Sequence, residues 1–149
     1  MATTVAKTKF TSKIVETLTL KSQPQQVITT LEINDVTDYS HRIMSVATGT
    51  STIMNLGVSD AAGRIEAARF KYMRITNLDD TNNVRLTFQL TSNTDTYEVV
   101  IGPKTSHILT SKSGDITTGG ADASLEDITV IKGTAVTADC DVEVFTVST

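Results

Sequence analysis

Cysteine is almost missing from this sequence of 149 residues, in which Cys140 is the only one. A single thiol allows no disulfide within the chain, no cysteine-based zinc site and no redox pair, so synthesis in a reducing cytoplasm is the natural inference. Cys140 alternates with Val142 and Val144, which places it on an apolar face. We therefore predict a buried and unreactive thiol.

Long apolar runs and clusters of basic residues are also missing. No stretch approaches the ~20 apolar residues of a membrane helix, and the first seven residues carry no apolar core of the kind found in a secretion signal. The 13 Lys and Arg are scattered and are outnumbered by 17 Asp and Glu, which gives a net charge of −4. We expect no membrane partner and no direct contact with nucleic acid, which needs concentrated positive charge.

Threonine is unusually common, with 27 copies, many of them alternating with aliphatic residues. A β-branched side chain with a hydroxyl suits the wet face of a half-buried strand. The clearest case is residues 84–90, where Val84, Leu86, Phe88 and Leu90 share one face. Residues 96–101 follow after a short polar loop at 92–95, so the two segments predict a β-hairpin.

Further alternating segments predict an all-β fold. The break at residues 22–25 contains Pro24, which fits a turn. The total is eight or nine strands with little helix, and the expected architecture is an antiparallel β-sandwich of the jelly-roll or immunoglobulin-like type. The other strand candidates are residues 10–20, 27–33, 39–47, 51–54, 106–110, 128–132 and 140–147.

The domain organisation follows from the length, which suits one core. We expect a single β-sandwich domain over residues 1–149, with residues 1–9 as an extended N-terminal arm. Residues 59–68 tolerate at most a turn of helix or a long loop. Residues 111–124, which contain three glycines, are expected to form an exposed and irregular connection.

Candidate catalytic and metal-binding residues are few. His41 and His107 each stand alone in a strand-like segment, and we interpret them as surface or satisfied half-buried side chains. The oxygen-rich loop 77–83 offers Asp79, Asp80 and Asn82 as a weak metal candidate, although Asp and Asn also favour turns for backbone reasons. The glycines at 114–120 lack the residues of a phosphate-binding loop. We expect no enzyme activity and no cofactor.

A β-domain of this kind acts through its surface, its strand edges or its ends. The candidate partner contacts are in the N-terminal segment and the last strand: Thr3, Thr4, Val5, Lys7, Phe145 and Val147. Carbohydrate binding is an alternative, for which Tyr39, Tyr72 and Tyr97 are the available rings. With no Trp, three Tyr and four Phe, the chain has few platforms on which a sugar could stack.

One passage resembles a pattern in small virion proteins of tailed bacteriophages, notably marine ones. In that pattern a strand ending in Arg-Ile-Thr-Asn leads to an acidic turn, a strand, a hairpin and a glycine-containing turn before another strand. The similarity is specific over about residues 70–110 and loose elsewhere, with a further match in the acidic and hydrophobic ending at 141–145. The segments that carry it are residues 72–82, 84–86, 95–97 and 101–106.

The resemblance implies a virion structural protein, made in the host cytoplasm, and first of all a head decoration or cement protein. Such proteins commonly sit as trimers or other oligomers on the capsid and bridge neighbouring copies of the major capsid protein, so the resemblance implies a homo-oligomer for this chain, with a trimer favoured. Binding only to the assembled shell would stabilise it by mass action. A tail, neck or fibre-associated virion protein is the alternative within the same class, and a carbohydrate-binding module for host attachment is the alternative outside it.

Overall fold

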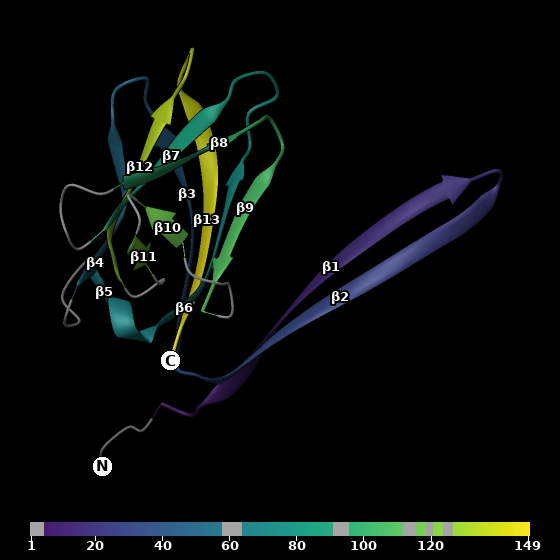
Figure 1. The fold of residues 1–149 in the computed structure, drawn as a ribbon, viewed down its shortest axis with the longest axis horizontal. Helices are drawn as coiled ribbons and strands as arrows, with labels where there is room; N and C mark the ends of the chain where they lie inside the picture. Colours follow the sequence, from purple (N-terminus) through teal and green to yellow (C-terminus); the bar gives the residue numbers. More distant parts are fainter. Residues whose placement is uncertain (1–4, 58–63, 91–95, 112–115, 119–120, 124–126) are drawn as a thin grey trace. The chain divides into compact units, whose positions relative to one another are not determined.

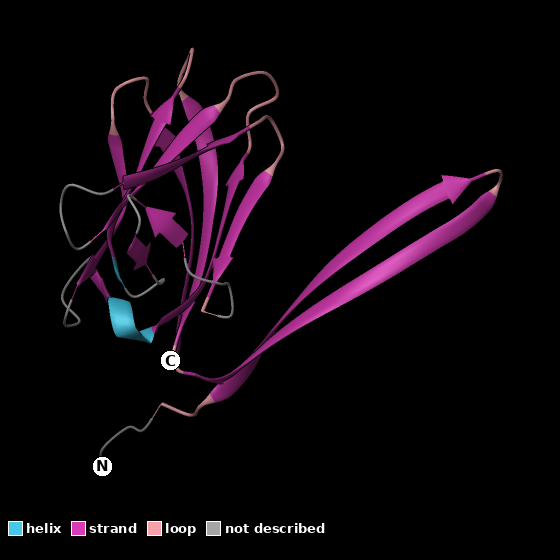
Figure 2. Cartoon of the chain, in the orientation of Figure 1, coloured by secondary structure: helices cyan, strands magenta, loops and turns pink. Residues whose placement is uncertain are grey.

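The chain was analysed as a computed structural model that describes residues 5–57, 64–90, 96–111, 116–118, 121–123 and 127–149. Strands dominate it, and the one helical element with described bounds is the short 3₁₀ turn Ala67–Arg69 (Figure 2). The chain divides into two compact units, residues 39–148 and residues 1–38 with Thr149. Among the described residues, no helix is both long and apolar enough to cross a membrane.

The larger unit is a sandwich of two sheets, whose strands are labelled in Figure 1. One sheet has five strands in the order β5-β4-β12-β7-β8, and the other has four in the order β3-β13-β6-β9. Antiparallel pairing prevails, and β5 runs parallel to β4. The prediction of an antiparallel β-sandwich is therefore confirmed. The bounds are β3 Asp38–Val46, β4 Ser51–Gly57, β5 Arg64–Glu66, β6 Phe70–Asn77, β7 Val84–Leu90, β8 Thr96–Ile101, β9 Ser106–Thr110, β12 Ile128–Ala135 and β13 Cys140–Ser148.

The core lies between these two sheets and is built by the two-residue alternation of the strands. In β7, the four apolar residues predicted to share a face are all buried, at 0–4% exposure. β7 pairs with β8 from Val84 and Ile101 to Gln89 and Thr96, so the predicted hairpin strands are confirmed, while the loop at 92–95 lies outside the described residues. The largest fully buried side chains are Phe70, Phe88, Ile53, Met73, Ile75, Leu86, Ile128 and Ile131.

Cys140 is buried in this core at 1% exposure, as its position among alternating valines predicts. Its Sγ lies 3.2 Å from the carbonyl oxygen of Ala138 and donates to it. Burial, followed by the charges of nearby carboxylates such as Asp79, raises the pKa of the thiol. The thiol is therefore held in its protonated and less nucleophilic form.

The smaller unit contains a long β-ribbon, formed by β1 (Thr8–Leu20) and β2 (Gln23–Val36). These strands pair with each other and make a two-stranded sheet of their own, whereas the sequence prediction placed them among the strands of the sandwich. Alternation indicates which side chains share a face, but it carries no information about which other strand lies alongside. Residues 1–4 of the predicted arm lie outside the described residues, and Thr8 already belongs to β1.

The turn of the ribbon differs from the predicted one. Lys21 and Ser22 form a two-residue loop, and both have positive φ, 48° and 63°. This is the backbone pattern of the tight turns that match the twist of a hairpin, usually signalled by Asn-Gly, which this sequence lacks. Pro24 lies within β2, opposite Thr19, so its placement in the turn was wrong. A two-stranded ribbon has free edges, where the missing N–H of proline is tolerated.

Two other irregular segments are partly described. Residues 64–66 form β5 and Ala67–Arg69 form the 3₁₀ turn. This agrees with the expectation that residues 59–68 hold at most one turn of helix, although residues 59–63 lie outside the described residues. Within 111–124, the expected irregular connection, β10 (Ile116–Thr118) and β11 (Ala121–Ala123) pair as a short antiparallel sheet. That expectation was wrong for these six residues.

Candidate functional site

Four aspartates surround a pocket at the end of the sandwich where β6 ends and β13 begins. We call Asp79, Asp80, Asp139 and Asp141 the acidic rim; Leu78 completes the lining. Asp79 and Asp80 follow β6, while Asp139 and Asp141 flank the first residue of β13. The backbone N–H of Leu78 donates to the carbonyl of Asp141 at 2.9 Å and joins the two segments.

Asp79, the first metal candidate, organises its own turn. Its Oδ1 accepts hydrogen bonds from the backbone N–H groups of Thr81 at 2.7 Å and Asn82 at 2.6 Å, and from the Asn82 side chain at 3.3 Å. The two backbone hydrogen bonds lower the pKa of Asp79, because they favour the charged carboxylate. Asp79 and Asn82 therefore act as turn residues that hydrogen-bond to each other. This is the second of the two interpretations that the sequence allowed for them, the first being metal binding.

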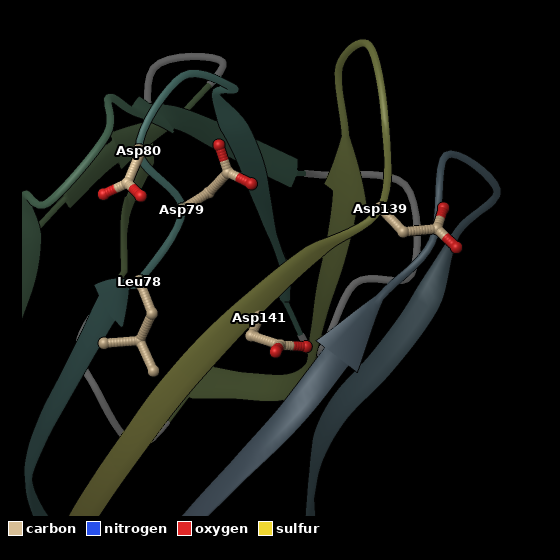
Figure 3. A pocket seen from close by; sticks show the side chains of 5 residues that line it. All are labelled: Leu78, Asp79, Asp80, Asp139 and Asp141. Atoms are coloured by element: carbon tan, nitrogen blue, oxygen red, sulfur yellow. The ribbon is translucent and has the colours of Figure 1, made fainter.

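The other rim carboxylates face different partners. Asp80 forms an ion pair with Lys104 at 2.8 Å, and Asp139 accepts a hydrogen bond from the backbone N–H of Thr48 at 3.1 Å. Figure 3 shows the four carboxylates pointing in different directions instead of toward one centre. Within the described ranges, no group of three His, Cys, Asp or Glu is placed to hold a metal ion.

A second polar cluster lies on the four-stranded sheet and centres on Glu143 of β13. Its Oε1 lies 2.8 Å from Nε2 of His41, and its Oε2 lies 2.7 Å from a guanidinium nitrogen of Arg74. The hydrogen bond from His41, followed by the positive charge of Arg74, lowers the pKa of Glu143. The carboxylate therefore cross-links β3, β13 and β6.

We expect Glu143→Gln to destabilise the protein by less than about 1 kcal/mol at neutral pH, because the cluster is partly exposed. Since the folded-state pKa of Glu143 is lowered, its stabilising effect is present above the unfolded value near 4.5 and is lost as the pH falls through the folded value. Urea denaturation of both proteins between neutral and acidic pH measures this. A stability difference that grows on acidification would contradict the assignment.

The two histidines differ in environment. His41 is at the surface, half exposed beside Glu143, in agreement with its structural interpretation. His107, on β9, is half-buried, and its ring centroid lies 5.6 Å from that of Phe88. Burial lowers the pKa of His107, and its half-buried position agrees with the expectation from the sequence.

The three tyrosines considered for sugar binding are unequally placed. Tyr39 is 69% exposed, but Tyr72 is only 3% exposed. Tyr97 stacks on Phe88 with 4.3 Å between ring centroids, and its hydroxyl is buried. Only the first of the three presents a ring that a pyranose could reach, which leaves little platform for stacking.

The predicted partner contacts differ in their exposure. Thr3 and Thr4 lie outside the described residues, while Val5 is 62% exposed. Lys7 lies 3.8 Å from the carboxylate of Asp35, within the ribbon unit. Phe145 is half-buried and its ring lies 6.3 Å from that of Tyr39, and Val147 is 1% exposed in β13.

A larger candidate surface is one face of the β-ribbon, which the sequence analysis missed. The register places most of its large apolar side chains on the same side, because each pairs with a residue of matching orientation. Four of them are strongly exposed, between 47% for Ile14 and 61% for Leu18. The alternation was visible in the sequence, but it was assigned to strands of the sandwich. We call this the apolar ribbon face, which consists of four exposed residues, two half-buried residues and one residue that is 6% exposed: Ile14, Leu18, Leu20 and Val27, then Phe10 and Leu31, then Ile33.

Comparisons with known proteins add no relative: no protein-family model, no curated protein and no solved structure matches this chain.

Proposed function

We propose that this chain is a structural protein of a tailed-phage particle, first of all a head decoration or cement protein that binds and stabilises the assembled shell. The observation that carries the proposal is the apolar ribbon face, on which Leu18, Leu20 and Val27 are each about 60% exposed. The protein acts by binding the major capsid protein or other virion proteins. It carries out no chemistry of its own.

The physics of a two-stranded ribbon supports a binding role. An isolated pair of strands is at best marginally stable in water, and independent stability needs a third strand or a packed face. Contiguous apolar patches larger than a few hundred Å² are rare on monomers and commonly mark interaction sites. Burial of a Leu or Val side chain is worth about 1.5–3 kcal/mol, so a row of them can hold a partner firmly.

The phage-like passage also supports the proposal, since it corresponds to a continuous part of the sandwich. Residues 70–110 run from β6 through the Asn77 loop, β7 and β8 into β9. The turn at Gly102 is closed by Thr105, whose N–H and hydroxyl both donate to the Gly102 carbonyl, at 3.3 and 2.8 Å. The residues that carry the resemblance therefore build two strand connections and the strands that they join.

Copy number tests the proposal and separates it from the tail, neck or fibre alternative. Purified particles that contain this chain are digested and the chain is quantified by mass spectrometry against the major capsid protein. A decoration protein should be present at tens to hundreds of copies, and a tail component at far fewer. If the chain is missing from purified particles, the proposal fails.

Introducing a charged side chain on the apolar ribbon face tests whether this face binds the particle. Val27→Asp places a carboxylate on the apolar ribbon face, where its burial against a partner is unfavourable, and we expect binding to particles stripped of this chain to weaken at least about tenfold. Sedimentation of the particles with added protein measures this. Ile28→Asp is the matched control, because Ile28 is the next residue, is similarly exposed at 54% and points to the opposite face. Equal effects of both variants would contradict the role of the face.

A further inference from the structure

The outer edge of β1 is open in the part of the chain that the structure describes, where β1 pairs with β2 alone. In a two-residue hairpin loop with positive φ at both positions, the two residues that flank the loop form a hydrogen-bonded pair. Here those residues are Leu20 and Gln23. Hydrogen-bonded and non-hydrogen-bonded pairs then alternate along the ribbon. The odd-numbered residues from Thr11 to Thr19 therefore direct their N–H and C=O groups away from β2.

The two edges of the ribbon are not equivalent. On β2 the outward groups belong to the even-numbered residues, beginning with Pro24 opposite Thr19. Pro24 has no N–H, and proline on an edge is a common protection against strand pairing. β1 contains neither proline nor glycine between Thr8 and Leu20. The edge of β1 is thus the better template for another strand.

We infer that two copies of this chain pair through β1, antiparallel and centred on Ile14, to give a continuous sheet in the order β2-β1-β1′-β2′. A two-fold axis perpendicular to the sheet pairs residues of equal parity, so the outward groups of one β1 meet those of the other. Ile14 is the midpoint of β1, and this register is therefore the one that pairs all 13 residues of the strand. The inference deepens the proposed function, on which it rests for its biological setting.

The side chains favour this register over its neighbours. With Ile14 opposite its own copy, Phe10 lies opposite Leu18 of the second copy, and Ser12 lies opposite Glu16 and can donate to its carboxylate. A register centred on Lys13 would place two lysines opposite each other, and one centred on Glu16 would place two glutamates there. Like charges in directly opposed positions destabilise a sheet. The register centred on Val15 would set Ile14 against Glu16.

Proline substitutions test the edge. Lys13→Pro removes an outward N–H from β1, and Thr30→Pro, at the residue directly opposite in the ribbon, removes the equivalent group from the outer edge of β2. We expect light scattering to give twice the mass of one chain for the unmodified protein. The dissociation constant should rise at least about tenfold for Lys13→Pro and change by less than about threefold for Thr30→Pro. Equal weakening by both would overturn the assignment of the edge, because it would reflect damage to the ribbon.

Engineered disulfides test the register. Ile14 and its copy form a non-hydrogen-bonded pair, whose Cα atoms lie about 4.5 Å apart, within the range that a disulfide bridges. Under mild oxidation, Ile14→Cys should give a covalent dimer. Phe10→Cys and Leu18→Cys should cross-link efficiently when the two variants are mixed, and poorly when each is alone. Cys140, at 1% exposure, is not available to compete.

The outcomes separate the inference from the proposed function. A monomeric unmodified protein, or cross-linking of Leu18→Cys alone as efficiently as Ile14→Cys, would overturn the pairing. If Val27→Asp still weakened particle binding in that case, the particle role would stand without the pairing. Dimers with the expected cross-links and no presence in particles would leave the pairing in place and remove the virion role.

Discussion

Phe88→Ala should lower the free energy of unfolding by about 3–5 kcal/mol, the usual cost of removing a large buried ring. Phe88 lies at 0% exposure near the middle of β7, with Tyr97 beside it on β8 and Ile131 beside it on β12. Its ring is nearly parallel to that of Tyr97, with 6° between the planes. It also contacts His107 of the opposite sheet, so its removal opens a cavity between the two sheets.

The chemistry of that cavity affects the size of the loss. The Tyr97 hydroxyl and the His107 Nε2 are buried without a partner among the described residues. Polar cavities of sufficient size are hydrated, so a water that enters the space left by Phe88 should offset part of the loss. We therefore expect a loss toward the lower end of the range, and a smaller loss for Phe88→Leu, which keeps most of the volume.

Thr87→Ala is the matched control for Phe88→Ala. Thr87 is the preceding residue, points to the other face of β7 and donates its hydroxyl to Glu98 at 3.0 Å near the solvent. We expect a loss well under about 1 kcal/mol, typical of a partly exposed hydrogen bond. Guanidinium denaturation of the three proteins gives the values. The reverse order of the two losses would show that the assigned faces of β7 are exchanged.

The β7–β8 hairpin shows what the sequence could predict about the fold. Four apolar residues in strict alternation, a polar interruption and a second alternating segment are each local signals, and they require no knowledge of the rest of the chain. The same rule identified β3, β4, β9, β12 and β13 to within a few residues. Short-range chemistry also identified the turns at Asp79 and Gly102.

The β-ribbon shows where that reasoning ends. Apolar residues alternate along much of the segment from Phe10 to Ile33, as they do in the core strands, but an alternation does not specify whether the apolar side meets its own chain, another chain or water. The turn was misplaced because proline is a strong local signal, whereas Lys21 and Ser22 adopt positive φ without one. The candidate surface was missed for the same reason, since its exposure depends on which strands are neighbours.

Asn77 is the polar residue on which the connections around the acidic rim depend. It is 0% exposed at the end of β6. Its Nδ2 donates to the carbonyls of Asn82 at 2.8 Å and Gly102 at 3.1 Å, and its Oδ1 accepts from the N–H of Asp79 at 3.0 Å. One amide thus satisfies backbone groups in both the β6–β7 loop and the β8–β9 turn, which are the two connections that carry the phage-like pattern.

We expect Asn77→Leu to destabilise the protein by about 3 kcal/mol, because it leaves three backbone groups without their partner in a largely buried position. Loss of the amide should also loosen both connections. Hydrogen exchange at Asp79 should therefore accelerate far more than exchange in β12. Thermal or chemical denaturation gives the stability, and equal acceleration at both places would indicate global destabilisation without a specific role for the amide.

Asn77→Asp separates hydrogen bonding from size, because the two side chains have almost the same shape. A carboxylate at this position would face the carbonyl oxygens of Asn82 and Gly102, where the amide now donates.

Burial and these two carbonyls disfavour the charged form of the new carboxyl, so its folded-state pKa is raised above its unfolded value. Its favourable contribution is then present at acidic pH, where a protonated carboxyl can donate to one carbonyl, and is lost as the pH rises through the folded value. The stability gap between Asn77→Asp and the unmodified protein should therefore narrow on acidification, because the new carboxyl is best tolerated in its protonated form. A gap that does not change with pH would show that the side chain at this position reaches solvent, and a gap that widens at low pH would show that hydrogen-bond donors surround the carboxylate; in either case the two connections are held in another way.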